Sequence, residues 1–298
     1  MIPTAGDWDR SDRHCFFLAG GELSASQPHV LLAVNELGSP TRLEALERML
    51  DAGTNVLIDS GIFWLTNEHK RTHGITMNEA LALAPEEIDG WDWLWDRYLS
   101  IVTTYGDRVW GYIELDQGGM ENKRRTRQRL RDLGLRPMPV YHPLNDGWDY
   151  FDELATETDR LCWGNVVQAS HTVRRAFMVT LWERHRAYPD LWVHVLGLTP
   201  NQHLNAYPVD SADSSTWLAP VRWSLGYTER AMLKVFSRLD HDYHPALGTK
   251  DQDSPHSNAR ALAMSAFGMA AMERGWRHWQ ARMEDELGLP LYPAPGES

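Results

Sequence analysis

The sequence predicts an α/β fold of the (β/α)8 type, a TIM barrel, with a C-terminal helical extension. Short apolar runs rich in β-branched or aromatic residues recur along the chain, and longer segments with helical spacing separate them. This alternation is typical of parallel strands joined by crossover helices. Polar residues follow several of the runs, as they do at the carboxyl ends of barrel strands. The chain has 298 residues, 43% of them hydrophobic, which is enough for one large barrel with a packed core.

Eight of the apolar runs are candidate strands. They are Cys15 to Ala19, His29 to Val34, Asn55 to Asp59, Val109 to Leu115, Met138 to His142, Leu161 to Asn165, Trp192 to Leu198 and Tyr207 to Asp213. Two of the intervening helices have clear signals: Ser39 and Pro40 supply a cap and a first-turn proline, and the stretch from Ser170 to His185 has helical periodicity.

The last part of the chain differs in composition from the rest. Residues 239–257 are polar and contain histidine, proline and glycine, which predicts a loop, and residues 258–287 have helical spacing before a proline-rich end. We expect a barrel domain over residues 1–238 and a loop with a helical cap over residues 239–298, both within one folded domain. The histidines of the loop fit no metal-ligand spacing, so no metal site is predicted.

Charge and cysteine content exclude several classes of protein. A net charge of −12 argues against broad, nonspecific binding of nucleic acid, although a local basic patch can override the average. No run of 18 apolar residues occurs and the start has no signal-peptide pattern, so we expect a soluble, cytoplasmic protein outside the membrane. Cys15 and Cys162 give neither a disulfide framework nor a cysteine zinc site, and we expect both to be buried thiols.

Two acids stand at the ends of strand-like runs about 150 residues apart. Asp59 ends one run and Asp213 ends another, so both would lie at the carboxyl-terminal mouth of a barrel. Such a pair suits an enzyme that breaks and remakes a glycosidic bond, because one carboxylate can act as nucleophile while the other handles protons. From the residues alone, Asp59 also fits a turn, Asp116 a loop entry and Asp213 a helix N-cap.

The segments Asp59-Ser60-Gly61-Ile62-Phe63 and Val209-Asp210-Ser211-Ala212-Asp213 resemble the two signature segments of the tRNA-guanine transglycosylase family. Three further stretches fall between them in the family's order, namely Glu114-Leu115-Asp116, Trp163-Gly164-Asn165 and Val195 to Pro200. The resemblance spans roughly residues 15–220. It implies a barrel enzyme that exchanges guanine for a 7-deazaguanine base without a cofactor.

The resemblance also implies a role for individual residues. Asp213 would attack the anomeric carbon as nucleophile, Asp59 would act as general base, and Asp116 would accept hydrogen bonds from N1 and the exocyclic amine of the purine. The other implied substrate-binding residues are Ser60, Gly61, Phe63, His142, Gly164, Asn165 and Gly197.

The departures from the family bear on the substrate. The tRNA enzymes hold zinc with three cysteines and a histidine after the nucleophile, whereas this chain has no cysteine after Cys162. The segment Asp210 to Trp217 is more similar to the zinc-free transglycosylases of bacteria and their phages that place deazapurines in DNA. We therefore expect a preQ0-like base to replace guanine in DNA. The same exchange on tRNA, a hydrolase, and a non-catalytic barrel that binds nucleic acid or a partner protein remain alternatives, and a homodimer or an auxiliary protein would be compatible with each.

The densest basic run extends from Lys123 to Arg131. An enzyme that extrudes a base from a duplex needs contacts to the phosphates, and this run follows the predicted base-recognising acid closely. We expect the phosphate contacts to come from Lys123, Arg124, Arg127 and Arg131. A solvated helix face is the alternative interpretation.

Overall fold

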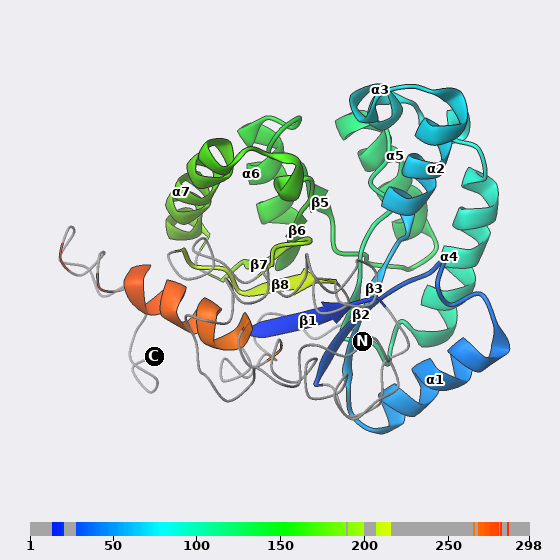
Figure 1. The fold of residues 1–298 in the computed structure, drawn as a ribbon, viewed down its shortest axis with the longest axis horizontal. Helices are drawn as coiled ribbons and strands as arrows, with labels where there is room; N and C mark the ends of the chain where they lie inside the picture. The colour runs from blue at the N-terminus through cyan, green and yellow to red at the C-terminus, as the bar shows by residue number, and fades with distance from the viewer. Residues whose placement is uncertain are drawn as a thin grey trace, which may run out of the picture. The chain divides into compact units, whose positions relative to one another are not determined.

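The computed structural model describes residues 14–20, 28–188, 190–199, 207–215, 265, 268–279, 281 and 285. The chain divides into two compact units: unit 1 comprises Met1–Asp7 and Ala19–Gly164, and unit 2 comprises Trp8–Leu18 and Asn165–Ser298. From β2 to α7, strands alternate along the chain with one or more helices (Figure 1). The predicted loop over residues 239–257 lies outside the described residues, so the predicted domain boundary at residue 238 stays a prediction.

The eight predicted strands are present. They are β1 (Cys15–Ala19), β2 (His29–Ala33), β3 (Asn55–Asp59), β4 (Gly111–Tyr112), β5 (Val140–Tyr141), β6 (Arg160–Trp163), β7 (Trp192–Val195) and β8 (Ser211–Ser214). Only β1 and β3 match the length of the apolar runs that predicted them. The other six strands are shorter, because the hydrogen-bonded ladder covers only part of each run.

Strand order confirms the predicted fold class. The strands are parallel and hydrogen-bonded in the order β4-β3-β2-β1-β8-β7-β6-β5, in which the last strand pairs with the first, as in a (β/α)8 barrel. A parallel bridge between Ile113 and Met138 links the segments of β4 and β5, the two strands at the ends of this order. The chain therefore has an α/β, barrel-like fold.

The helices of unit 1 follow the strands as crossover connections. They are α1 (Pro40–Asp51), α2 (Ile62–His73), α3 (Met77–Ala82), the short η3 (Pro85–Glu87), α4 (Trp91–Tyr105), α5 (Gly119–Asp132) and α6 (Trp148–Glu157). Helix α1 begins as predicted, with the Ser39 side chain accepting a hydrogen bond from the Arg42 amide and proline in the first turn. None of the helices in the described residues has the length and apolar character needed to cross a membrane.

An insertion replaces the simple crossover between β3 and β4. Helices α2 and α3 precede the long crossover helix α4 and pack against each other (Figure 1). The buried Gln117 side chain, which follows β4, ties them down: it donates to the carbonyls of Ala80 and Leu83 and accepts from the Thr66 hydroxyl at 3.0 Å. This single amide satisfies polar groups of both inserted helices, so the insertion is fixed to the end of β4.

Unit 2 contains most of β1, strands β7 and β8, the short η4 (Val166–Gln168), α7 (His171–Ala187) and a helical stretch over residues 268–279. This last stretch falls within the predicted C-terminal helices. It packs against β1 and the segment before β8. Trp276 donates from its indole N–H to the Val209 carbonyl at 3.0 Å, and Gly268 lies directly against the ring of Phe16. Cys15 and Cys162 are buried and form no disulfide, as predicted.

Candidate functional site

The predicted residues of unit 1 lie at the carboxyl ends of its strands. Asp59 is the last residue of β3, Asp116 lies in the segment after β4, His142 follows β5 directly, and Gly164 follows β6. In a parallel sheet these ends share one edge, which is where (β/α)8 enzymes place their active sites. Asp59 therefore ends a strand and leads into a turn. This position fits an acid at the mouth of a barrel and also fits a residue that only forms the turn.

Asp116 and His142 form a close pair. His142 Nε2 donates to Asp116 Oδ2 at 2.7 Å, and the two side chains are only 12% and 13% exposed. Burial alone would raise the pKa of Asp116, but the hydrogen bond from His142 and the positive charges of His142 and Lys123 outweigh burial and hold the pKa below its ordinary value. Asp116 is thus an ionised, acceptor-only carboxylate with one oxygen bound to imidazole.

Gly164 provides the space that the His142 ring occupies. A Cβ at Gly164 would lie 2.6 Å from His142 Cδ2 and 2.7 Å from its Nε2, closer than such contacts occur. Any other residue would push the ring out of its bond with Asp116. Gly164 was predicted to let a base approach the backbone; in this structure it admits the histidine that holds Asp116.

The turn after Asp59 has a second glycine of this kind. Gly61 has a φ of 76°, which favours glycine, and it begins α2 while the buried Ser60 hydroxyl accepts from the Ile62 amide. A Cβ at Gly61 would lie 2.6 Å from Oδ1 of Asn35. Phe63 follows on the first turn of α2 with 54% of its surface exposed, so its ring is available for stacking.

Asn35 is a candidate that sequence reasoning missed. It lies in the turn after β2, at the same edge as Asp59 and Gly61, and its Oδ1 is buried without a hydrogen-bond partner in the described part of the chain. A buried acceptor without a donor costs about 1–3 kcal/mol, so a ligand N–H that reached it would recover that energy. Nothing in the local sequence marks this asparagine, because its position depends on the turn meeting Gly61.

Asp213 lies on β8 in unit 2, in a strand and not at a helix N-cap. It is 6% exposed, and its Oδ1 accepts from the Gly197 amide at 2.8 Å and contacts His194 Nε2 at 3.3 Å. Within the described residues no hydrogen bond reaches Oδ2. The structure therefore brings together the predicted Asp213 and Gly197. It fixes one carboxylate oxygen, while none of the described residues donates to the other.

His194 connects Asp213 to a chain of buried polar groups. The Trp192 indole can only donate, so Ser211 Oγ accepts from it at 2.7 Å, and the same oxygen lies 2.8 Å from His194 Nδ1. On the other side of the ring, His194 Nε2 lies 3.3 Å from Asp213 Oδ1, where an N–H would donate to an ionised carboxylate. The fully buried histidine thus links Ser211 to Asp213.

The second acid of the same segment has a structural role. Asp210 is fully buried, its Oδ2 accepts from the Val193 amide at 2.9 Å, and its backbone carbonyl accepts from the Cys15 amide. These bonds join β8 to the strands on either side.

Two residues of the basic run cannot contact a phosphate in this conformation. Lys123 is fully buried and binds Asp146 and the Val140 carbonyl, and Arg127 is 2% exposed and pairs with Glu114 Oε2 at 3.0 Å. Burial raises the pKa of Glu114 above its ordinary value, and the charges of Arg127 and Lys123 offset only part of that rise. These cations support the core between α5 and the neighbouring strands, in contrast to the predicted phosphate contacts.

The other two predicted phosphate contacts lie at the surface of α5. Arg124 and Arg131 are each about a third exposed, and they pair with Glu153 and Glu157 of α6. The hydrogen bond from Arg124 holds the pKa of Glu153 below its ordinary value. Asn165, the remaining predicted residue, begins η4 in unit 2 with a φ of 49°.

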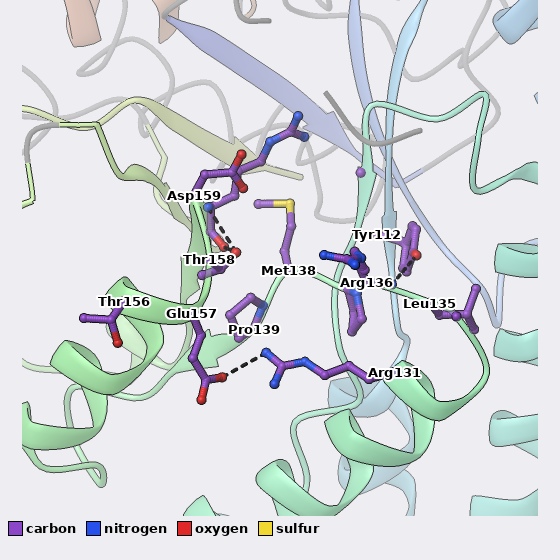
Figure 2. A pocket seen from close by; sticks show the side chains of 14 residues that line it. Tyr112, Arg131, Leu135, Arg136, Met138, Pro139, Thr156, Glu157, Thr158 and Asp159 are labelled. Atoms are coloured by element: carbon purple, nitrogen blue, oxygen red, sulfur yellow. Dashed lines mark hydrogen bonds and ion pairs between the residues drawn. The ribbon is translucent and has the colours of Figure 1, made fainter. Parts of the chain in front are cut away.

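A pocket of about 740 Å³ lies away from these residues. Its lining comes from the amino-terminal ends of β4, β5 and β6 and the carboxyl ends of α5 and α6. Figure 2 shows Arg131 bonded to Glu157 at this pocket, with Tyr112 and Met138 in the same lining. The predicted site is at the opposite, carboxyl-terminal ends of the same strands, so the pocket is separate from it.

No protein-family model matches the chain, and no curated protein matches it. The chain is therefore described by its fold, an α/β barrel-like fold, and by candidate acids at or after the carboxyl ends of its strands, namely Asp59, Asp116 and Asp213.

Proposed function

We propose that this protein is a transglycosylase that exchanges guanine for a 7-deazaguanine, preQ0-like base in DNA. The observation that carries the proposal is the setting of Asp213: one oxygen is held by Gly197 and His194, and the other has no donor in the described residues. A nucleophilic carboxylate needs this arrangement, because an oxygen that already accepts strong hydrogen bonds is a poorer nucleophile.

The proposed reaction has two displacements at the anomeric carbon. Asp213 Oδ2 attacks C1′, the C1′–N9 bond breaks, and guanine leaves with the bond pair and takes up a proton from solvent. Asp59 then removes the N9 proton of the incoming 7-deazaguanine, whose nitrogen attacks C1′ and releases the Asp213 carboxylate. The exchange needs no oxidant or cofactor, since a covalent glycosyl-enzyme conserves the energy of the bond.

Base recognition is assigned to the acceptors of unit 1. Asp116 is ionised and would accept from N1–H and the exocyclic amine of guanine, an edge that both guanine and 7-deazaguanine present. Asn35 Oδ1 is a further acceptor at the same strand edge, and the exposed Phe63 ring offers a face for stacking. Ser60 and Gly61 shape the turn that carries Phe63.

Two features favour DNA over tRNA as the substrate. The segment 210–217 is similar to that of the DNA-modifying transglycosylases, and the chain has no cysteine after Cys162 that could bind the zinc of the tRNA enzymes. The proposal assigns no phosphate contact to Lys123 or Arg127, because both side chains are buried.

The test is base exchange by purified protein. Protein, preQ0 and either guanine-containing duplex DNA or unmodified tRNA are incubated, digested to nucleosides and analysed by mass spectrometry. We expect a deazaguanine deoxynucleoside that disappears with Asp213→Asn and persists with Asp92→Asn, an exposed aspartate on α4. A modified ribonucleoside would identify tRNA as the substrate, and full exchange by a folded Asp213→Asn variant would refute the mechanism.

A further inference from the structure

Three potential metal ligands converge on the inserted helices of unit 1, outside the site described above. His69 and His73 lie one turn apart on α2, and Asp89 precedes α4. The ligand atoms, Nδ1 of His69, Nε2 of His73 and a carboxylate oxygen of Asp89, all lie within 4.8 Å of one another. Histidines one helical turn apart project from the same face, which is the spacing that metal sites on helices use.

The separations are close to those of a tetrahedral zinc site. With zinc–nitrogen distances of about 2.0–2.1 Å, ligand atoms on a tetrahedron lie about 3.3 Å apart. His69 Nδ1 is 3.4 Å from Asp89 Oδ2, and His73 Nε2 is 2.7 Å from the same oxygen. The distance from His73 Nε2 to Asp89 Oδ2 must lengthen by roughly half an ångström, and the half-exposed His73 lies at the surface, where it has room to shift. The third separation, between the two histidine nitrogens, lies within 4.8 Å.

One hydrogen bond of the cluster must give way to a metal. The Asp89 backbone amide donates to His69 Nδ1 at 3.1 Å, so zinc at this nitrogen would take the lone pair that now accepts the amide proton. The rings of His69 and His73 stack with centroids 4.2 Å apart.

We propose that His69, His73 and Asp89 form a zinc site with solvent in the remaining coordination position. Two imidazoles and one carboxylate are a ligand set that zinc accepts, and the half-exposed His73 and 66% exposed Asp89 leave the open position facing water. The site joins the carboxyl end of α2 to the turn before α4 and so clamps the inserted helices. It is independent of the proposed base exchange.

The test measures zinc bound to the whole protein. Metal-stripped protein is dialysed against buffered Zn²⁺, and the bound metal is measured by mass spectrometry. We expect one equivalent for the wild type, at least about 100-fold weaker binding for His73→Ala and for Asp89→Asn, and unchanged binding for His278→Ala, an exposed histidine of unit 2. Loss of a direct ligand should cost no less than the roughly 10–100-fold seen for groups one shell further out.

Two further measurements complete the test. Zinc should raise the melting temperature of the wild type but not of the two ligand variants, because binding to the folded state alone shifts unfolding. Co²⁺ in place of zinc should give the visible absorption of a four- or five-coordinate ion that His73→Ala abolishes. The proposal is overturned by wild type that binds no zinc, or by binding that survives in both His73→Ala and Asp89→Asn, since the ion would then lie elsewhere.

Discussion

Two substitutions of His194 can distinguish the effect of its contact with Asp213 from the effect of its contact with Ser211. In His194→Gln the side-chain amide nitrogen stands near the position of Nε2 and can still donate to Asp213. In His194→Asn the shorter amide stands near Nδ1, so it keeps a partner in Ser211 and loses Asp213. The two variants change the same buried residue, which makes each a control for the other.

The magnitude follows from the geometry. A hydrogen bond to a charged group contributes about 1.5–3 kcal/mol. The contact of 3.3 Å is longer than the roughly 2.7–2.9 Å of strong charge-assisted bonds, so the lower end, about 1.5 kcal/mol, applies. If this energy orients Asp213 for attack, His194→Asn should lower kcat about 10-fold, with KM little changed. His194→Gln should retain most of the activity.

The assay is steady-state base exchange, with unfolding in urea measured in parallel. Both variants leave one buried polar group short of a partner, so each should lose about 1–3 kcal/mol of stability. Equal kcat for the two folded variants, or a greater loss in His194→Gln, would refute the positioning of Asp213 by His194.

Three other predictions concern stability. Gly268→Ala would place a Cβ 2.1 Å from the buried Phe16 ring and should cost about 1–3 kcal/mol in urea unfolding; an unchanged midpoint would mean that the C-terminal helix does not pack there. Because the folded pKa of Asp116 is lowered, its ionised form adds stability that is present above about pH 4 and is lost as pH falls further, so the stability advantage of wild type over Asp116→Asn should shrink from pH 5 to pH 3. Arg127→Leu leaves the buried Glu114 carboxylate without its ion-pair partner and should lower the free energy of unfolding in urea by about 3–5 kcal/mol. If Arg127 were instead a surface phosphate contact, the substitution would leave this free energy unchanged.

The strand pattern was predictable because it depends on local composition. Apolar runs identified all eight strands, the Ser39 cap identified the start of α1, and the helical periodicity from Ser170 to His185 identified α7. The insertion of α2 and α3 was not predicted, since α3 is short and the Gln117 contacts that fix both helices come from a residue far along the chain. The proposed zinc ligands were missed for a similar reason: Asp89 meets the two histidines only after the chain has passed through α3 and η3.

The basic run shows why charge density alone misassigns a helix. Lys123 and Arg127 lie one turn apart, so they share the face of α5 that turns toward the strands, where Asp146 and Glu114 meet them. Arg125 and Arg129 lie on other parts of the helix, with Glu86 and the Trp95 ring as partners. A sequence gives the number of charges on a helix. Which of them are neutralised depends on acids supplied by other elements.

The residues around Asp213 could have been predicted from the sequence by applying the two-residue periodicity of a strand. Side chains at alternate positions of a strand share a face, so Ser211 and Asp213 face one way on β8, and Trp192 and His194 face one way on β7. The register that sets His194 opposite Ser211 then brings all four together. Reading β7 as Trp-x-His and β8 as Ser-x-Asp would have predicted a polar face along two neighbouring parallel strands. Such a face is exceptional among strands whose neighbouring positions are apolar, and a buried histidine beside a carboxylate is therefore better explained by a role in holding that carboxylate than by packing alone.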